Sequence, residues 1–121
     1  MISVGVVDDD QSVRKSLTNL LKAAGYCPTS FASGEDFLAC ADIDTLDCVL
    51  IDLRMNGLQG IQVQRLLAQR KERPAVICMS AFWDDTSWNE AMAQGAYRCL
   101  RKPFTAEDLL SSIREAISLE S

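Results

Sequence analysis

The sequence contains no histidine and no apolar run long enough to cross a membrane. Without histidine, the chain has no imidazole for acid/base catalysis and cannot itself carry a phosphohistidine. A membrane-spanning helix needs about 20 apolar residues. A strand-like pattern begins at once with Met1–Val4, which argues against a signal peptide. We therefore expect a cytoplasmic protein that does not associate with a membrane.

Basic residues and paired cysteines are also scarce. Lysine and arginine number 12 against 17 aspartate and glutamate residues, the net charge is −5, and no basic block occurs. This balance argues against nucleic-acid binding by this domain itself. The five cysteines are odd in number and form no CxxC motif, so we interpret them as reduced core or near-core thiols rather than disulfides or zinc ligands. They are Cys27, Cys40, Cys48, Cys78 and Cys99.

Short apolar runs alternate with helical apolar periodicity five times along the 121 residues. Strands are predicted at 2–7, 27–31, 47–52, 75–79 and 97–100, and helices at 13–24, 33–41, 61–67, 84–94 and 105–117. This alternation predicts an α/β fold, a single doubly wound five-stranded parallel sheet within one domain spanning 1–121. Right-handed crossovers and an edge position for the second strand, which contains Pro28, favour the flavodoxin-like strand order 2-1-3-4-5.

The predicted third strand ends in a carboxylate. Residues 48–51 are apolar and lead directly into Asp52, and Asn56–Gly57 then indicates a turn. In the order 2-1-3-4-5 the first and third strands are neighbours, so Asp8 and Asp9 after the first strand should lie close to Asp52. Two carboxylates about 4 Å apart repel by about 4 kcal/mol at an effective dielectric constant of about 20. We therefore expect a proton or a cation to offset the repulsion between these carboxylates.

The fourth and fifth predicted strands bring Ser80 and Lys102 to the same edge of the sheet. The carboxylate oxygens of Asp8, Asp9 and Asp52 at this edge suit a hard divalent cation, Mg²⁺ or Mn²⁺. A carboxylate can attack a phosphoryl group and form an acyl phosphate, so Asp52 is the candidate nucleophile. The Ser80 hydroxyl and the Lys102 ammonium group would then hold the remaining phosphoryl oxygens.

These motifs resemble the receiver domain of bacterial two-component response regulators, and the resemblance covers the whole chain. It is carried by Val7–Asp10, Leu50–Met55, Ser80–Ala81 and Lys102–Phe104, and it is closest to receivers that precede a helix-turn-helix output domain. The resemblance implies a CheY-like (βα)5 fold and a phosphorylation-activated switch in transcription regulation. A cognate histidine kinase would donate the phosphoryl group to Asp52.

The resemblance also implies what the domain does after phosphorylation. Such a domain is not a turnover enzyme, because it catalyses only its own phosphorylation and dephosphorylation. It changes the surface formed by the fourth helix, fifth strand and fifth helix, through which a homodimer can form.

The resemblance further implies a role for each site residue. Asp9 and the phosphoacceptor Asp52 would bind the metal ion directly. Asp8 would interact with the ion indirectly, through a direct ligand or through a bound water. The backbone carbonyl of Arg54 would complete the metal site. Ser80 would be the switch hydroxyl, and the Lys102–Pro103 peptide bond would be cis.

The sequence departs from the family pattern near the switch. Asn56 replaces the usual proline, Cys99 replaces the usual aromatic switch residue, and the bulky Phe82 and Trp83 follow Ser80–Ala81. None of these departures falls on the three aspartates, Ser80 or Lys102, so we expect the phosphoacceptor chemistry to be retained. We hypothesise that Trp88, on the fourth helix and facing the fifth strand near Cys99, is the aromatic element of the output face.

Other interpretations remain open. An FMN protein needs a Ser/Thr/Gly-rich phosphate loop where this chain has aspartates. An aspartyl-phosphate hydrolase of the haloacid-dehalogenase type carries a second aspartate at the position of Arg54. A degenerate receiver would act as a phosphate-independent interaction module. Asp10, next to the acidic pair, is most simply a helix N-cap.

Overall fold

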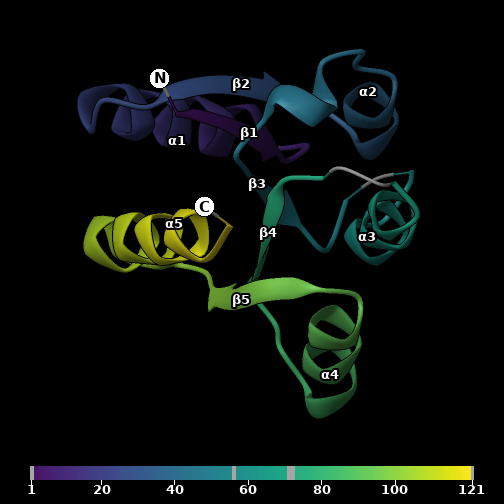
Figure 1. Ribbon diagram of the computed structural model, residues 1–121. Helices are drawn as coiled ribbons and strands as arrows, with labels where there is room; N and C mark the ends of the chain where they lie inside the picture. Colours follow the sequence, from purple (N-terminus) through teal and green to yellow (C-terminus); the bar gives the residue numbers. More distant parts are fainter. Residues whose placement is uncertain (1, 56, 71–72, 121) are drawn as a thin grey trace.

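Five short apolar segments form one parallel sheet in the order β2-β1-β3-β4-β5 (Figure 1). The computed structural model describes residues 2–55, 57–70 and 73–120. The strands are β1 (Ser3–Val7), β2 (Cys27–Phe31), β3 (Cys48–Asp52), β4 (Ala75–Ser80) and β5 (Ala96–Arg101). The helices are α1 (Gln11–Ala23), α2 (Gly34–Leu38), α3 (Gly60–Ala68), α4 (Asp85–Ala93) and α5 (Ala106–Glu120). The predicted fold and strand order are confirmed.

The helices cover both faces of the sheet. Figure 1 shows α1 and α5 on one side and α2, α3 and α4 on the other. The continuous apolar runs in β3 and β4 are explained by this arrangement, since all their residues are buried. Alternate side chains along these strands supply two separate hydrophobic cores, one on each face.

Local signals place most of the element ends. Asp10 caps α1 because its Oδ1 accepts hydrogen bonds from the backbone N–H groups of Ser12 and Val13. After α1 the chain leaves the helix at Gly25, which has a φ of 92°. The interpretation of Asp10 as an N-cap is confirmed.

The segment after α2 differs from the prediction. The helix ends at Leu38 rather than continuing to 41, and a short 3₁₀ helix follows at Ile43–Thr45. Ile43 is fully buried in the core beside α2 and α3. The chain turns early because this turn places Ile43 in the core, a long-range contact that helical periodicity does not reveal. The predicted turn at Asn56–Gly57 is described only in part. Gly57 has a φ of 77°, and Asn56 lies outside the described residues.

The cysteines follow the prediction with one exception. Cys48, Cys78 and Cys99 are buried and Cys40 is partly buried, and none of the five cysteines, all within the described residues, forms a disulfide. Cys27, in contrast, is exposed, so its assignment as a core or near-core thiol was wrong. It lies on the edge strand β2, which is partly open to solvent.

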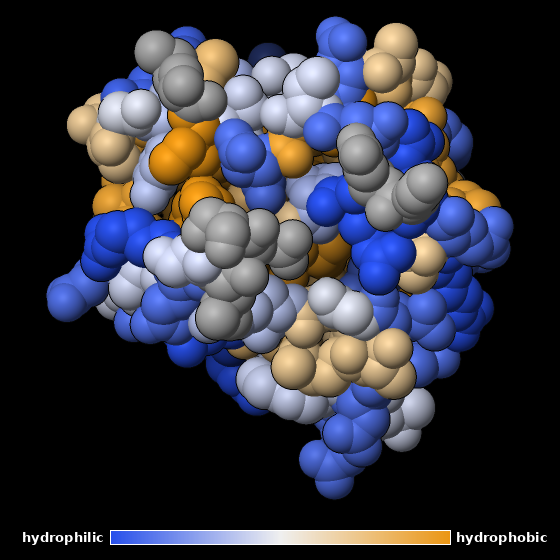
Figure 2. All heavy atoms as spheres, in the orientation of Figure 1, coloured by the Kyte–Doolittle hydropathy of each residue, from blue (hydrophilic) through white to orange (hydrophobic). Residues whose placement is uncertain are grey.

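Neither the surface in Figure 2 nor the described helices show a long continuous apolar stretch, in agreement with the short apolar runs of the sequence. The face seen in Figure 2 is largely hydrophilic, with hydrophobic residues in separate patches between polar ones. Within the described ranges, no helix combines the length and apolar character that a membrane span requires.

Candidate functional site

Three carboxylates meet where β1 and β3 end. Val7 of β1 pairs with Ile51 of β3, which brings the residues that follow each strand to the same edge of the sheet. Asp8, Asp9 and Asp52 each present a carboxylate oxygen within 4.8 Å of those of the other two. Asp8 is fully buried and Asp52 is 6% exposed, whereas Asp9 is exposed. The predicted acidic cluster is confirmed as a geometric feature.

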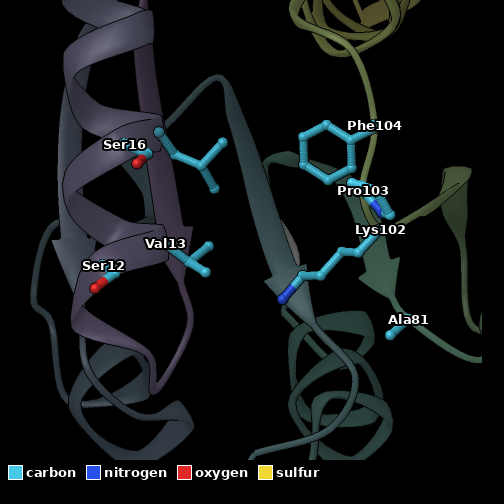
Figure 3. A pocket seen from close by; sticks show the side chains of 8 residues that line it. Ser12, Val13, Ser16, Ala81, Lys102, Pro103 and Phe104 are labelled. Atoms are coloured by element: carbon cyan, nitrogen blue, oxygen red, sulfur yellow. The ribbon is translucent and has the colours of Figure 1, made fainter.

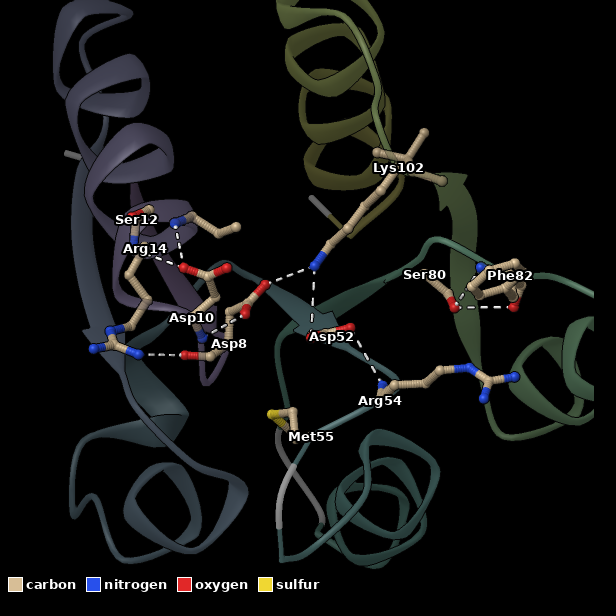
Figure 4. Close-up of polar contacts among 12 residues, drawn as sticks. Asp8, Asp10, Ser12, Arg14, Asp52, Arg54, Met55, Ser80, Phe82 and Lys102 are labelled. Atoms are coloured by element: carbon tan, nitrogen blue, oxygen red, sulfur yellow. Dashed lines mark hydrogen bonds and ion pairs between the residues drawn. The ribbon is translucent and has the colours of Figure 1, made fainter.

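Lys102 bridges the two buried carboxylates (Figure 4). Its Nζ donates a hydrogen bond to Asp8 Oδ2 at 2.8 Å and lies 3.5 Å from Asp52 Oδ2. Burial alone would lower the pKa of Lys102, but the hydrogen bond to Asp8 and the charge of Asp52 outweigh burial and raise it. The ammonium group is therefore fixed in its charged form at the centre of the site.

The pKa of Asp52 records the crowding of negative charge. Burial, and then the neighbouring charge of Asp8, raise the pKa of Asp52 from 3.8 to about 6, although Lys102 acts in the opposite direction. A carboxylate whose pKa is raised by burial and by a neighbouring negative charge favours binding of a proton or a cation. The donor set, three carboxylates with one open to solvent, fits a hard divalent ion that keeps several waters.

The backbone around Asp8 is held by two groups. The Asp10 N–H donates to Asp8 Oδ1 at 2.9 Å, which leaves Oδ2 for Lys102. The Arg14 guanidinium donates to the Asp8 carbonyl oxygen at 2.7 Å. Arg14 was missed by sequence reasoning, although a cation one helical turn after an acidic loop is a usable signal.

The loop after Asp52 lies close against the site. The Arg54 N–H donates to Asp52 Oδ1 at 3.2 Å, and the Arg54 guanidinium lies over the Phe82 ring, 5.8 Å from its centre. Gly60, the first residue of α3, was also missed. A Cβ at Gly60 would lie 2.5 Å from the Asp52 carbonyl oxygen, so no other residue allows α3 to begin this close to the site.

Ser80 lies on the neighbouring strand, and its hydroxyl is already engaged. Asp52 pairs with Met79 in the β3–β4 register, which places Ser80 one residue further along the same edge. Ser80 Oγ donates to the Phe82 carbonyl at 3.0 Å and accepts from the Phe82 N–H at 3.2 Å. Ser80 is 1% exposed, and its carbonyl accepts a hydrogen bond from the Lys102 N–H.

Two tryptophans, Trp83 and Trp88, lie together between α4 and β5. Trp88, which is expected to face β5 near Cys99, is 42% exposed. Trp83 packs against the core cluster that contains Cys99, and its indole N–H donates to the Leu100 carbonyl at 2.9 Å. Trp88 rests edge-on against Trp83, with ring centres 5.3 Å apart. Burial of α4 is centred on Ala91, which is fully buried, and the role of Trp88 in the output face stays a prediction.

A mainly apolar hollow opens beside Lys102. It has a volume of about 570 Å³ and separates the first turns of α1 from the segment after β5. Figure 3 shows Ser12 and Val13 on one wall and Pro103 and Phe104 on the other. The Lys102–Pro103 peptide bond is cis, as the resemblance implied.

A parallel sheet of this order, with an acidic cluster and a lysine at its carboxyl edge, is the architecture of a CheY-like receiver domain. The chain belongs to the response regulator receiver domain family, whose model matches residues 4–114.

Individual relatives show how much of a longer protein the chain represents. It is 40% identical over 118 residues to the transcriptional regulatory protein TdiR of Thauera aromatica, covering 97% of this chain and 52% of TdiR. It is 37% identical over 115 residues to the DNA-binding transcriptional regulator NtrC of Salmonella typhimurium, covering 95% of this chain and 24% of NtrC. The chain thus spans about half or less of these curated relatives.

A solved structure gives the same result for the fold. The chemotaxis protein CheY4 of Vibrio cholerae superposes with a TM-score of 0.85 at 28% sequence identity. The match covers 96% of this chain and 98% of CheY4.

Proposed function

We propose that Asp52 accepts a phosphoryl group from a histidine kinase and that the domain acts as a phosphorylation-activated switch. The observation that carries this proposal is the pair of buried carboxylates, Asp8 and Asp52, joined by the Lys102 ammonium group. This arrangement suits a site that receives a negatively charged group together with a cation.

Asp52 is the nucleophile in this proposal. One of its carboxylate oxygens forms a bond to phosphorus while the phosphorus–nitrogen bond of the kinase phosphohistidine breaks, and the departing imidazole takes up a proton. Lys102 stays within reach of Asp52 and neutralises charge that gathers on the phosphoryl oxygens. The Ser80 hydroxyl, at the adjacent strand end, donates to one of those oxygens once it turns toward Asp52.

A Mg²⁺ or Mn²⁺ ion would be held by Asp9, Asp52 and the Arg54 carbonyl. Asp8 would contact the ion only indirectly, through one of these ligands or a water. When bound, the ion supplies charge neutralisation and polarises a phosphoryl oxygen. The exposed position of Asp9 leaves the open side of the cluster accessible to the ion and its waters.

The output is inferred from the surface and the relatives. TdiR and NtrC are transcriptional regulators by name, and we infer that this domain likewise controls a transcriptional output. The surface of α4, β5 and α5 is the proposed site of change and of homodimer formation. The net charge of −5 makes direct nucleic-acid binding by the domain unfavourable.

The test uses a small-molecule phosphodonor. Acetyl phosphate and Mg²⁺ should add one phosphoryl group to the wild-type chain, detected by intact mass, and Asp52→Asn should remain unmodified. EDTA should prevent the reaction. Absence of modification in the wild type under all these conditions would contradict the proposal and favour a phosphate-independent interaction module.

A further inference from the structure

We propose that Trp83 couples the phosphoacceptor site to the exposed surface of α4, by a hydrogen bond to β5 that holds the unphosphorylated form. The inference rests on the proposed function and deepens it, since it names the positioning residue that transmits the change. The aromatic switch position of the family is Cys99 here, and a thiol lacks the ring to perform that motion.

The first step is the hydroxyl of Ser80. A serine hydroxyl has a single proton, and in this structure that proton is donated to the Phe82 carbonyl. The same oxygen accepts the Phe82 N–H, so the Ser80–Phe82 turn is closed on itself. Ser80 therefore cannot donate to a phosphoryl oxygen on Asp52 without releasing the Phe82 carbonyl, which belongs to the peptide group that joins Phe82 to Trp83.

The second step is the residue that follows. Trp83 is joined directly to Phe82, so a rotation of the Phe82 peptide displaces the Trp83 backbone. The Trp83 indole is a donor only, and its single N–H is committed to the Leu100 carbonyl of β5 at 2.9 Å. Displacement of the loop therefore acts on this bond, which ties the β4–α4 loop to β5.

The third step reaches the surface. The Trp83 ring contacts the Trp88 ring edge-on, with centres 5.3 Å apart and planes at 73°. Trp88 and Met92, one helical turn apart on α4, are 42% and 41% exposed. Movement of Trp83 removes one side of the Trp88 packing, so the exposed apolar part of α4 changes shape when Ser80 turns.

The first experiment observes the indole N–H directly by ¹H–¹⁵N NMR of the wild-type chain, with Trp83→Phe and Trp88→Phe used to assign the two signals. Acetyl phosphate and Mg²⁺ provide phosphorylation, and intact mass confirms it. The Trp83 signal should move upfield and its solvent exchange should accelerate at least tenfold. A phosphorylated protein with an unchanged Trp83 signal would refute the inference and leave the proposed function standing. An absence of phosphorylation would overturn both.

The second experiment separates coupling from packing. Trp83→Phe keeps an aromatic ring but removes the N–H that holds the unphosphorylated form. Phosphorylation by acetyl phosphate should therefore be about fivefold faster, the factor that corresponds to a hydrogen bond of about 1 kcal/mol. Tyr26→Phe, the matched control, removes a polar group from an aromatic side chain beside β2, at the opposite edge of the sheet from β5, and should react at the wild-type rate. A folded Trp83→Phe protein with an unchanged or slower rate would show that Trp83 is passive packing.

Discussion

Replacement of Asp52 by asparagine should stabilise the fold at neutral pH, although it abolishes the proposed phosphoacceptor. Burial and the nearby Asp8 raise the pKa of Asp52 from 3.8 to about 6, so the folded protein holds the Asp52 proton more tightly than the unfolded chain. A carboxyl group whose pKa is higher in the folded state does not lower the free energy of unfolding below about pH 4, where it is protonated in both states. It lowers that free energy increasingly as the pH rises toward about 6, and by a constant amount at higher pH.

The magnitude follows from the size of the shift. A shift of about 2 pKa units corresponds to about 3 kcal/mol, since each unit is worth 1.36 kcal/mol. Asparagine has nearly the shape of the protonated acid and carries no charge. Asp52→Asn should therefore raise the free energy of unfolding by about 3 kcal/mol at pH 8 and by less than about 1 kcal/mol at pH 4. The attraction to Lys102 is already included in the shifted pKa.

The assay is urea unfolding at pH 4, 6 and 8 in the presence of EDTA. Glu107→Gln is the matched control, because it removes one negative charge from the exposed first turn of α5. That control should change stability by only a few tenths of a kcal/mol at each pH. If Asp52→Asn is no more stable than the wild type at pH 8, or if its gain is the same at pH 4, the electrostatic reasoning is wrong.

Three further predictions concern the ion, the lifetime of the phosphoryl group and the output surface. At about ten times its Kd, Mg²⁺ should add about 1.4 kcal/mol, or about 5 °C in melting temperature, and Asp9→Ala should abolish that shift; an equal shift in the variant would place the ion elsewhere. Phe82 is 70% exposed beside Ser80 and should shield the phosphoryl group from water, so Phe82→Asn should lose phosphate severalfold faster, and an unchanged or slower rate would contradict this. In sedimentation of the phosphorylated chain, Trp88→Ala should weaken self-association by about 2 kcal/mol, whereas Leu66→Ala on α3 should not; equal association would exclude Trp88 from the interface.

Much of the architecture was determined by the sequence alone. Apolar runs and helical periodicity are local properties, and they identified all five strands and all five helices in the right sequence. The meeting of Asp8, Asp9 and Asp52 was also predictable, because the carboxyl ends of parallel strands share one edge of the sheet. Lys102 joined them for the same reason, since β5 ends at that edge.

Only the tertiary structure decided which side chains each element turns toward its neighbours. Helical spacing placed Trp88, Ala91 and Met92 on one face, but packing against the sheet buries Ala91 and leaves the two larger side chains partly exposed. Trp83 lies in a loop with no periodicity, so nothing local indicated that its indole would reach the Leu100 carbonyl of β5. These positions depend on contacts between segments far apart in the chain, and those contacts exist only once the sheet and its helices are assembled.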